Sequence, residues 1–328
     1  GILVKRGEVL ERLSKVTAYV FDKTGTLTDG DLTVVGVTSF NDLSEHQVLS
    51  LAASVEQYSE HIIATAIVDK AKHYHCERYT LQNFQAFPGQ GVSAVVNGDE
   101  IKLGTAEWLA ANDITLSSSQ LEQVSMTEEK GISCVFLARN TQIEAFIGLS
   151  DELRTEAVDV VLQLKQLGNN ITVLSGDRQI VVDSVTRSLG DVKRFAEVLP
   201  AEKSAAIKTI QSEGAVVAMV GDGVNDAPAL IQADVGIAMA SGTDVSIESA
   251  DVVISHQDLS KVLEASLLAK TTLRIIRQNI VLSITYNVIM VPLAMLAWVN
   301  PLIAAITMPI SSLLVIGNAS RIARYFKK

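Results

Sequence analysis

The sequence predicts an α/β protein with a doubly wound parallel sheet, a second α/β unit inserted into it, and a C-terminal hairpin of two transmembrane helices. Three observations support this. Apolar, β-prone segments alternate with helical segments near residue 16 and again from residue 151 onward. A strand-rich stretch with an Asn-Gly hairpin turn at residues 97–98 separates the two parts. Two long uncharged segments follow near the end of the chain.

Composition limits the function classes. A chain of 328 residues has room for two or three domains, and its net charge of -10 argues against a nucleic-acid-binding surface. The mean hydropathy of +0.29 is high, and the excess lies in the C-terminal part. Two cysteines, Cys76 and Cys134, are too few for a disulfide framework and fit a reducing cytoplasm. No signal peptide or initiator Met opens the chain, so we expect a fragment or a processed product.

The segment at residues 22–28 (DKTGTLT) organises the chain. It follows an apolar strand at residues 16–21, which places Asp22 at the carboxyl edge of a parallel sheet, where open α/β folds bind ligands. A carboxylate in that position can act as a nucleophile. Lys23 can hold phosphate charge and Gly25 permits a tight turn, although a plain polar turn would use the same residue types.

The elements before residue 150 divide into two groups. A helix at residues 8–15 leads into the Asp22 strand, and a strand at 32–40 leaves it. Residues 32–148 then read as a separate α/β domain. Its predicted helices are 42–54, opened by Asn41 or Asp42, then 62–72 and 106–112; its later strands are 93–96, 100–103, 131–138 and 142–149.

From residue 151 helices and strands alternate. Helices are predicted at 152–167, 179–189 and 201–213, and strands at 171–174, 195–198, 215–220, 235–239 and 252–255. Two of these strands end in polar groups, at residues 175–177 (SGD) and 221–226 (GDGVND). We expect these groups to meet Asp22 at one sheet edge. Converging carboxylates need a cation, and Mg²⁺ prefers such hard oxygen ligands.

The C-terminal part, residues 259–328, reads as a membrane segment with spans of about 280–299 and 302–320. Cations flank both spans on the same side of the membrane, which makes both flanks cytoplasmic: Lys261, Lys270, Arg274 and Arg277 before the first, and Arg321, Arg324, Lys327 and Lys328 after the second. The alternative is a pair of buried helices in a soluble protein.

Together these motifs resemble the haloacid-dehalogenase-like phosphorylation domain of P-type ATPases, in particular the copper-transporting type of class IB. Residues 22–28 and 221–230 (GDGVNDAPAL) match family signatures, residues 199–203 (LPAEK) match its PxxK element, and Ser175 stands where the family usually has Thr. The resemblance implies a stalk segment at 1–13, a phosphorylation domain at 14–31 and 149–258, and a nucleotide-binding domain at 32–148.

The resemblance also implies residue roles. Asp22 is the phosphoryl acceptor, the Thr24 carbonyl and Asp222 bind Mg²⁺ with it, and Lys203 and Ser175 contact the transferred phosphate. The other catalytic positions are Lys23, Thr24, Gly176, Asp177, Asn225 and Asp226. The cofactors implied are ATP and Mg²⁺.

A nucleotide site is implied in the inserted domain. Residues 59–61 (SEH) resemble the family's SEHP element, with Glu60 binding the adenine amino group and His61 orienting the base. Gly89, Gly91 and Val92 resemble its GxG loop, and Gly104 joins the same site. Ile62 replaces the usual Pro, and Thr105 stands where many copper pumps have Asn. A helix cap or surface pair is the plainer interpretation of Glu60 and His61.

The spans carry the clue to the cargo. Tyr286 and Asn287 lie in the first, and Met308 and Ser312 in the second. A thioether suits Cu(I), whereas Zn²⁺ or Cd²⁺ would favour an added carboxylate, and none lies between Ile280 and Ser320. Contacts between helices are the alternative use of these residues. His73, His75 and Cys76 do not have the spacing of a metal site.

The resemblance therefore predicts ATP-driven export of Cu(I) by a multi-pass protein of a bacterial inner membrane or plasma membrane, with cytoplasmic catalytic domains. Its partners would be ATP, Cu(I) or another soft metal ion, the lipid bilayer, and the N-terminal part of the same pump, with its actuator domain and Cys-Pro-Cys helix; no nucleic acid is expected. Two alternatives stay open: a zinc or cadmium pump, and a non-transporting nucleotide-binding membrane module that regulates or assembles with a complete pump.

Overall fold

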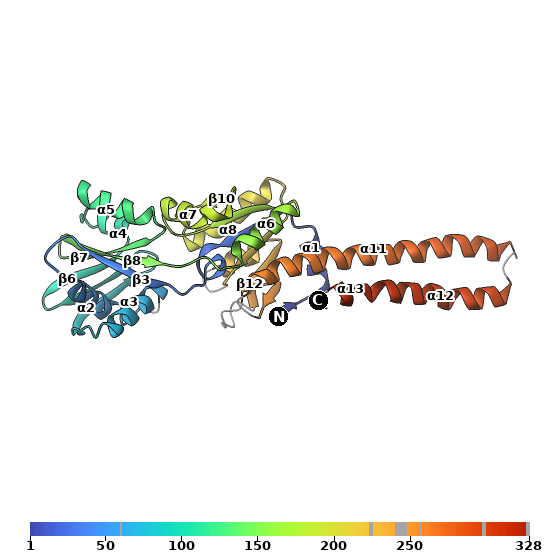
Figure 1. Ribbon diagram of the computed structural model, residues 1–328, viewed down its shortest axis with the longest axis horizontal. Helices are drawn as coiled ribbons and strands as arrows, with labels where there is room; N and C mark the ends of the chain where they lie inside the picture. Colours follow the sequence, from blue (N-terminus) through green and yellow to red (C-terminus); the bar gives the residue numbers. More distant parts are fainter. Residues whose placement is uncertain (60, 223–225, 240–247, 256–257, 297–299, 326–328) are drawn as a thin grey trace.

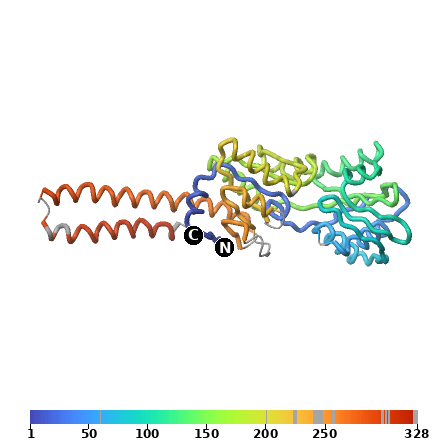
Figure 2. Tube along the Cα trace, turned by 180° about the vertical axis from the view of Figure 1, so that it is seen from behind, coloured from blue at the N-terminus to red at the C-terminus, as the bar shows by residue number. Residues whose placement is uncertain are grey.

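The computed structural model describes residues 1–328 except 60, 223–225, 240–247, 256–257, 297–299 and 326–328. Three parts follow one another along the molecule: a six-stranded sheet with its helices, a seven-stranded sheet with its helices, and a long helical hairpin (Figure 1). Seen from behind, the two chain ends lie close together where the hairpin meets the seven-stranded part (Figure 2).

The seven-stranded sheet has Asp22 near its centre. Its order is β1 (Ile2–Val4), β13 (Val252–Ile254), β12 (Val235–Met239), β11 (Val217–Gly221), β2 (Ala18–Asp22), β9 (Asn170–Leu174) and β10 (Lys193–Phe195). All neighbours are parallel except β1, which pairs antiparallel with β13. The doubly wound parallel sheet is thus confirmed, with an unpredicted antiparallel edge strand. The strand expected at 195–198 is wrong in position, because β10 pairs with β9 over residues 193–195.

Helices cover both faces of this sheet. On β2, Tyr19 and Phe21 face a core that includes α1 (Gly7–Ser14), α6 (Ala157–Gln166) and the start of α11 (Ser260–Met295). Ala18 and Val20 alternate to the other face, toward α8 (Pro200–Ser212) and α9 (Ala227–Gln232). Helix α7 (Gln179–Val185) continues into the short turn η2 (Thr186–Leu189).

The six-stranded sheet is antiparallel and is built only from residues 33–150. Its order is β3 (Thr33–Ser39), β8 (Gln142–Ser150), β7 (Ser133–Arg139), β6 (Asp99–Gly104), β5 (Gly91–Val96) and β4 (Leu81–Phe87). One face carries α2 (Glu45–Glu56) and α3 (Ile62–His73), and the other carries α4 (Ala106–Ala110) and α5 (Ser118–Glu128).

Two boundaries in this part differ from expectation. Helix α2 begins at Glu45, and its cap is Ser44 rather than Asn41 or Asp42, because Ser44 and Gln47 form a reciprocal capping box. Helix α5 was not predicted; it too begins with such a box, between Ser117 and Gln120, but it buries few apolar side chains.

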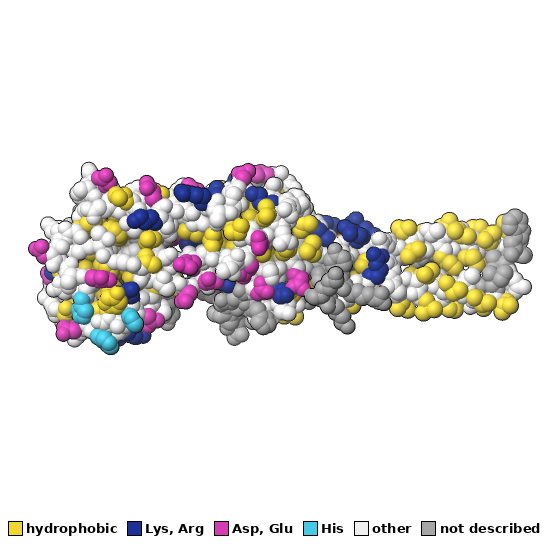
Figure 3. Space-filling model, viewed as in Figure 1, with side chains coloured by type: hydrophobic (Ala, Val, Ile, Leu, Met, Phe, Trp, Pro, Cys, Tyr) yellow, Lys and Arg dark blue, Asp and Glu magenta, His cyan; other side chains and the backbone are white. Residues whose placement is uncertain are grey.

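The hairpin consists of α11 (Ser260–Met295) and α12 (Pro301–Ala319), followed by the short α13 (Arg321–Tyr325). Both long helices are long and apolar enough to cross a membrane, and their span windows are not buried inside the protein. This exposure favours membrane helices over a soluble core, and the apolar surface is visible in Figure 3. Helix α11 begins twenty residues before the expected span, since Leu259, Val262 and Ala265 belong to the core of the seven-stranded part.

Candidate active site

Two strand ends and one helix bring charged side chains together at one edge of the seven-stranded sheet. Asp22 closes β2, and its Oδ1 lies 2.5 Å from Nζ of Lys203 on α8. The same Nζ lies 2.7 Å from Oδ1 of Asp226, the residue just before α9. All three residues are buried. One lysine therefore joins two carboxylates that are distant in sequence, which confirms that these strand ends converge.

The buried cluster shifts the protonation of its members. Burial and the neighbouring Asp226 raise the pKa of Asp22 to about 7, although Lys203 acts in the opposite direction. Burial alone would lower the pKa of Lys203, but the two carboxylates outweigh it and raise that pKa above its ordinary value. Lys203 is therefore a fixed positive charge beside Asp22.

The residues at this edge fit a hard divalent cation. Asp226 Oδ2 is buried and has no hydrogen-bond partner among the described residues. A Cβ added to Gly221 would lie only 2.6 Å from that oxygen, and one on Gly25 would lie 3.5 Å from Oδ2 of Asp222. The three carboxylates of Asp22, Asp222 and Asp226 thus carry more negative charge than Lys203 balances. A side chain at residue 221 would crowd the free oxygen of Asp226, so a glycine is required there. In the described part of the chain no three His, Cys, Asp or Glu residues are grouped so that they could hold a metal ion by themselves. Mg²⁺ commonly binds through one or two carboxylates together with substrate phosphates.

Lys23 and Asp177 form a second ion pair, in which Lys23 is buried and Asp177 is half-buried. Lys23 Nζ lies 2.8 Å from Asp177 Oδ2, and the Ser175 hydroxyl donates to the same oxygen at 2.8 Å. The Ser133 hydroxyl, from β7 of the six-stranded sheet, donates to Oδ1 at 2.9 Å. Burial works against ionisation, but Lys23 and the two hydroxyls hold the pKa of Asp177 below its ordinary value. Ser175 here faces Asp177, and Gly176 between them is exposed.

Asp151 and Arg154 hold the 22–28 loop, and sequence reasoning missed both. Thr28 Oγ1 lies 2.5 Å from Asp151 Oδ2, and the Gly30 amide donates to Asp151 Oδ1 at 3.1 Å. Buried Arg154 donates from Nε to the Thr26 carbonyl at 2.9 Å. The helix expected at 152–167 therefore begins only at Ala157, because residues 151–154 are bound to the loop. The sequence signal that could have identified them is the pair of charged residues, Asp151 and Arg154, directly after the inserted domain ends.

The residues predicted to bind the nucleotide lie in the six-stranded part of the molecule. His61 is the N-cap of α3, and its Nδ1 accepts from the Ile63 amide at 3.3 Å; burial lowers its pKa. Glu60, like Asn225 at the other site, lies outside the described residues. Thr105, the departure from the family pattern, caps α4 by accepting from the Trp108 amide.

The glycines expected at the nucleotide differ in their surroundings. Gly89 has a φ of 73° and no atom within 4 Å of an added Cβ, so the space beside it is open. A Cβ on Gly91 would lie 2.4 Å from the Leu103 carbonyl oxygen and 2.7 Å from the Trp108 ring. Gly104 packs against Gly91 and the same ring. Packing against Leu103 and Trp108 thus already requires a glycine at residue 91, and a role of Gly91 at the nucleotide stays a prediction. The Val92 side chain is buried in the core, so only the backbone of Val92 could contact a ligand.

Glu56 is a third residue that sequence reasoning missed. It ends α2, five residues before His61, and is buried. Burial raises its pKa to about 7, and its Oε2 has no hydrogen-bond partner among the described residues. A buried carboxyl with an unused oxygen beside a ligand loop is a common feature of binding sites. A lone Glu after an apolar helix gave no sequence signal.

The hairpin residues do not converge on one point. The Tyr286 hydroxyl lies 3.3 Å from Thr307 Oγ1, so Thr307 rather than Met308 faces it. Asn287, Met308 and Ser312 are exposed on the helix surfaces, and the Ser312 hydroxyl donates to the Met308 carbonyl one turn earlier. Within these two helices the four predicted residues therefore do not form a metal site by themselves.

Comparison with known proteins identifies the family. Residues 16–234 match the haloacid dehalogenase-like hydrolases. The chain is 40% identical over 325 residues to the probable copper-exporting P-type ATPase V of Mycobacterium tuberculosis, covering 99% of this chain and 42% of that protein. It is 37% identical over 337 residues to the probable copper-transporting ATPase PacS of Synechocystis sp., covering 99% and 45%. The chain thus spans less than half the length of these relatives.

Solved structures agree. A zinc-transporting PIB-type ATPase in its E2.Pi state superposes with a TM-score of 0.71 at 34% identity, covering 98% of this chain and 52% of that one. The catalytic domain of the CPx-ATPase CopB-B superposes with a TM-score of 0.66 at 29% identity, covering 81% and 95%. The fold, the residues around Asp22 and these matches show that the chain belongs to the haloacid dehalogenase-like hydrolases, with heavy-metal P-type ATPases as its relatives.

Proposed function

We propose that this chain is the catalytic and C-terminal membrane part of an ATP-driven heavy-metal pump, in which Asp22 accepts the γ-phosphoryl group of ATP. The observation that carries the proposal is the buried contact of Asp22 with Lys203 at the end of the central strand, inside an intact DKTGTLT segment. An Oδ atom of Asp22 attacks the γ-phosphorus, ADP leaves, and water later hydrolyses the aspartyl phosphate.

The neighbouring residues support that step through charge and position. Lys203 balances negative charge on the transferred group, while Asp226 keeps Lys203 in place. Asp22, Asp222 and the Thr24 carbonyl would hold Mg²⁺, which when bound neutralises phosphate charge. Lys23, held by Asp177, adds a second cation next to Asp22. Asn225 completes the set by resemblance.

The nucleotide would bind on the inserted domain, at residues 32–148. His61 and Glu60 would meet the base, and the open backbone at Gly89 would lie along the nucleotide. We add Glu56 to this group, because its free Oε2 can accept a hydrogen bond from an exocyclic amine. Gly91 and Gly104 contribute through the strand packing that shapes this surface.

For the cargo we propose Cu(I). The copper-exporting and copper-transporting relatives support copper, and the 68% exposed Met308 side chain is available to a soft ion beside a further helix. The structural similarity to a zinc-transporting PIB-type ATPase makes Zn²⁺ the second candidate. ATP hydrolysis by the full-length protein, measured with Cu(I), Ag(I), Zn²⁺ and Cd²⁺ side by side, separates the two. Stimulation by Zn²⁺ or Cd²⁺ alone would exclude copper.

The proposed pump is a multi-pass membrane protein whose catalytic part is cytoplasmic. In it, this chain works together with a segment equivalent to the part of its relatives that the chain does not match. The same metal assay tests the non-transporting alternative, because a regulatory module would show no metal-stimulated turnover.

Asp22→Asn tests the phosphoryl acceptor. An amide cannot form the acyl phosphate, so acid-stable, hydroxylamine-sensitive labelling from γ-labelled ATP should disappear. Asp159→Asn, on the exposed surface of α6, is the matched control and should label normally. Retained labelling of the Asp22 variant would reject this residue as the nucleophile.

A further inference from the structure

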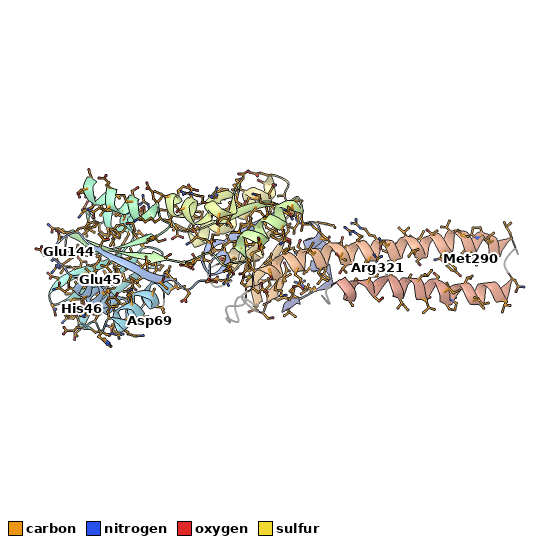
Figure 4. The ribbon with its side chains drawn as sticks, in the orientation of Figure 1. Glu45, His46, Asp69, Glu144, Met290 and Arg321 are labelled. Carbon is orange, nitrogen blue, oxygen red and sulfur yellow. The ribbon has the colours of Figure 1, made fainter. Side chains whose placement is uncertain are left out.

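A groove of about 1260 Å³ lies where the hairpin meets the catalytic part, between the end of α1 and the facing sides of α11 and α12. Its end near the catalytic part is cationic, and the cations are Lys15, Lys270, Arg274, Arg277 and Arg321. Its other end is apolar and is formed by Val281, Leu282, Leu313 and Leu314. Basic side chains gather at this junction in Figure 3. Figure 4 places Arg321 toward the end of the hairpin that adjoins the catalytic part.

The order of residues along α11 produces this division. Lys270, Arg274, Arg277 and Val281 are three or four residues apart, so they share one face of the helix. Helix α12 runs back alongside α11 and places Leu313 and Leu314 toward the hairpin tip, and Arg321, the first residue of α13, lies toward its base. Charged side chains thus line the base of the groove, and apolar side chains line it farther along both α11 and α12.

Four of the five cations that line the groove form no salt bridge with a carboxylate of the described residues. Lys15 is paired with Glu11 at 2.7 Å. Within the described ranges, no salt bridge joins Lys270, Arg274, Arg277 or Arg321 to an acidic side chain, and Arg321 instead donates to Asn318 Oδ1 at 3.0 Å. Glu11 interacts electrostatically with Arg277 as well as with Lys15, but one carboxylate does not balance five cations. The like charges around the groove repel one another, and an anion between them would relieve that repulsion.

We propose that this groove binds one phospholipid with an anionic headgroup from the cytoplasmic leaflet. The phosphate lies among Lys270, Arg274, Arg277 and Arg321, and an acyl chain lies along Val281, Leu282, Leu313 and Leu314. Free phosphate would leave the apolar half uncovered. A further transmembrane helix fits less well, because cytoplasmic helix ends are themselves rich in Lys and Arg and would add to the repulsion. The inference depends on the hairpin crossing a membrane and not on ATP or the transported metal.

Photochemical labelling of the full-length protein tests this proposal. Nanodiscs of phosphatidylcholine would contain phosphatidylglycerol with a diazirine on its acyl chain, and mass spectrometry would locate the labelled peptides. We expect label in the α11 and α12 peptides that line the groove. In the double variant Arg274→Gln/Arg277→Gln, the amount of label in these peptides should fall about fivefold for each cation removed. Arg78→Gln/Arg187→Gln, at two exposed sites outside the groove, removes the same charge and should label normally.

Further arms make the outcome decisive. Arg274→Lys/Arg277→Lys keeps the charge and should keep the label, and Arg321→Gln alone is a second variant if the double substitution does not fold. A phosphatidylcholine probe should label the groove weakly, and soluble glycerol phosphate should not displace the lipid. Absence of label in the wild-type groove, equal labelling by both lipids, unchanged labelling in the Gln variants, or displacement by glycerol phosphate would each overturn the proposal.

Discussion

Asp177 is the carboxylate through which the two sheets meet next to the active site. It binds Lys23 of the Asp22 loop on one side and Ser133 of β7 on the other. A second contact lies beside it, since Arg178 Nη1 is 2.6 Å from Oε2 of the buried Glu128 on α5. The position of Lys23 therefore depends on a residue of the other sheet.

Ser133→Ala should slow phosphorylation of Asp22 without weakening ATP binding. The variant removes one neutral donor from a charged acceptor, so we expect a decrease in rate of at most about tenfold. The measurement is single-turnover labelling at saturating ATP, together with a separate titration of nucleotide affinity. Ser212→Ala, whose exposed hydroxyl bonds only within α8, is the control. Equal rates for Ser133→Ala and wild type would show that this hydrogen bond does not position Lys23.

Glu56→Gln should reduce the pH dependence of stability. The folded-state pKa of Glu56 is raised by burial to about 7 from 4.5, so the folded protein binds more protons than the unfolded chain between these values. Stability therefore falls as pH rises through that window, by at most about 3 kcal/mol, and a glutamine lacks this loss. Thermal unfolding between pH 4.5 and 8 is the measurement. Exposed Glu122→Gln should follow the wild type, and parallel curves for all three proteins would contradict the assignment.

At the scale of elements, the pair β5 and β6 is held by two glycines facing one another under Trp108. Gly91→Ala would put a methyl group 2.4 Å from the Leu103 carbonyl, so we expect a loss of about 2 kcal/mol. Gly36→Ala, in β3 of the same sheet, meets nothing within 4 Å and is the matched control. Amide hydrogen exchange should accelerate in β5 and β6 for Gly91→Ala only. Unchanged exchange there would mean that the strands can shift to accept the methyl group.

Sequence patterns predicted the strands that end at active-site residues better than they predicted the bounds of the helices. The strands before Asp22, Ser175 and Asp222 were predicted because each is an apolar run closed by polar groups. Helix α5 was missed because only Val124 and Glu128 are buried along it. The start of α6 was misplaced because Asp151 and Arg154 bind a loop more than 120 residues earlier in the chain. Local patterns carry no information about such long-range bonds.

At the scale of the whole molecule, α11 connects the core of the catalytic part to the tip of the hairpin as one helix of 36 residues. Its first turns pack in the same core as Tyr19 and Phe21, which lie on the strand that ends in Asp22. A displacement of that core would therefore move the membrane segment with it, provided that the helix stays rigid.

Thr271→Gly/Ile276→Gly should separate the two activities of the proposed pump. Each glycine in a helix interior costs about 1 kcal/mol relative to alanine and lets the helix bend. We expect Asp22 to be phosphorylated from ATP, whereas metal stimulation of turnover should largely disappear. Thr271→Ala/Ile276→Ala removes the same side chains without loosening the backbone and is the control. Full metal stimulation in the glycine variant would show that a rigid α11 is not required.

The connection between the two sheets has a mechanical consequence. The chain leaves the Asp22 loop and returns to it side by side: Thr28 forms a bridge with Leu153 at one end of the crossing, and Thr33 pairs with Ser150 at the other. Two adjacent strands permit rotation about the line that joins them more readily than twisting or sliding. Once the contacts of Ser133 with Asp177 and of Glu128 with Arg178 separate, we therefore expect the six-stranded part to move toward and away from Asp22 by rotation about this connection.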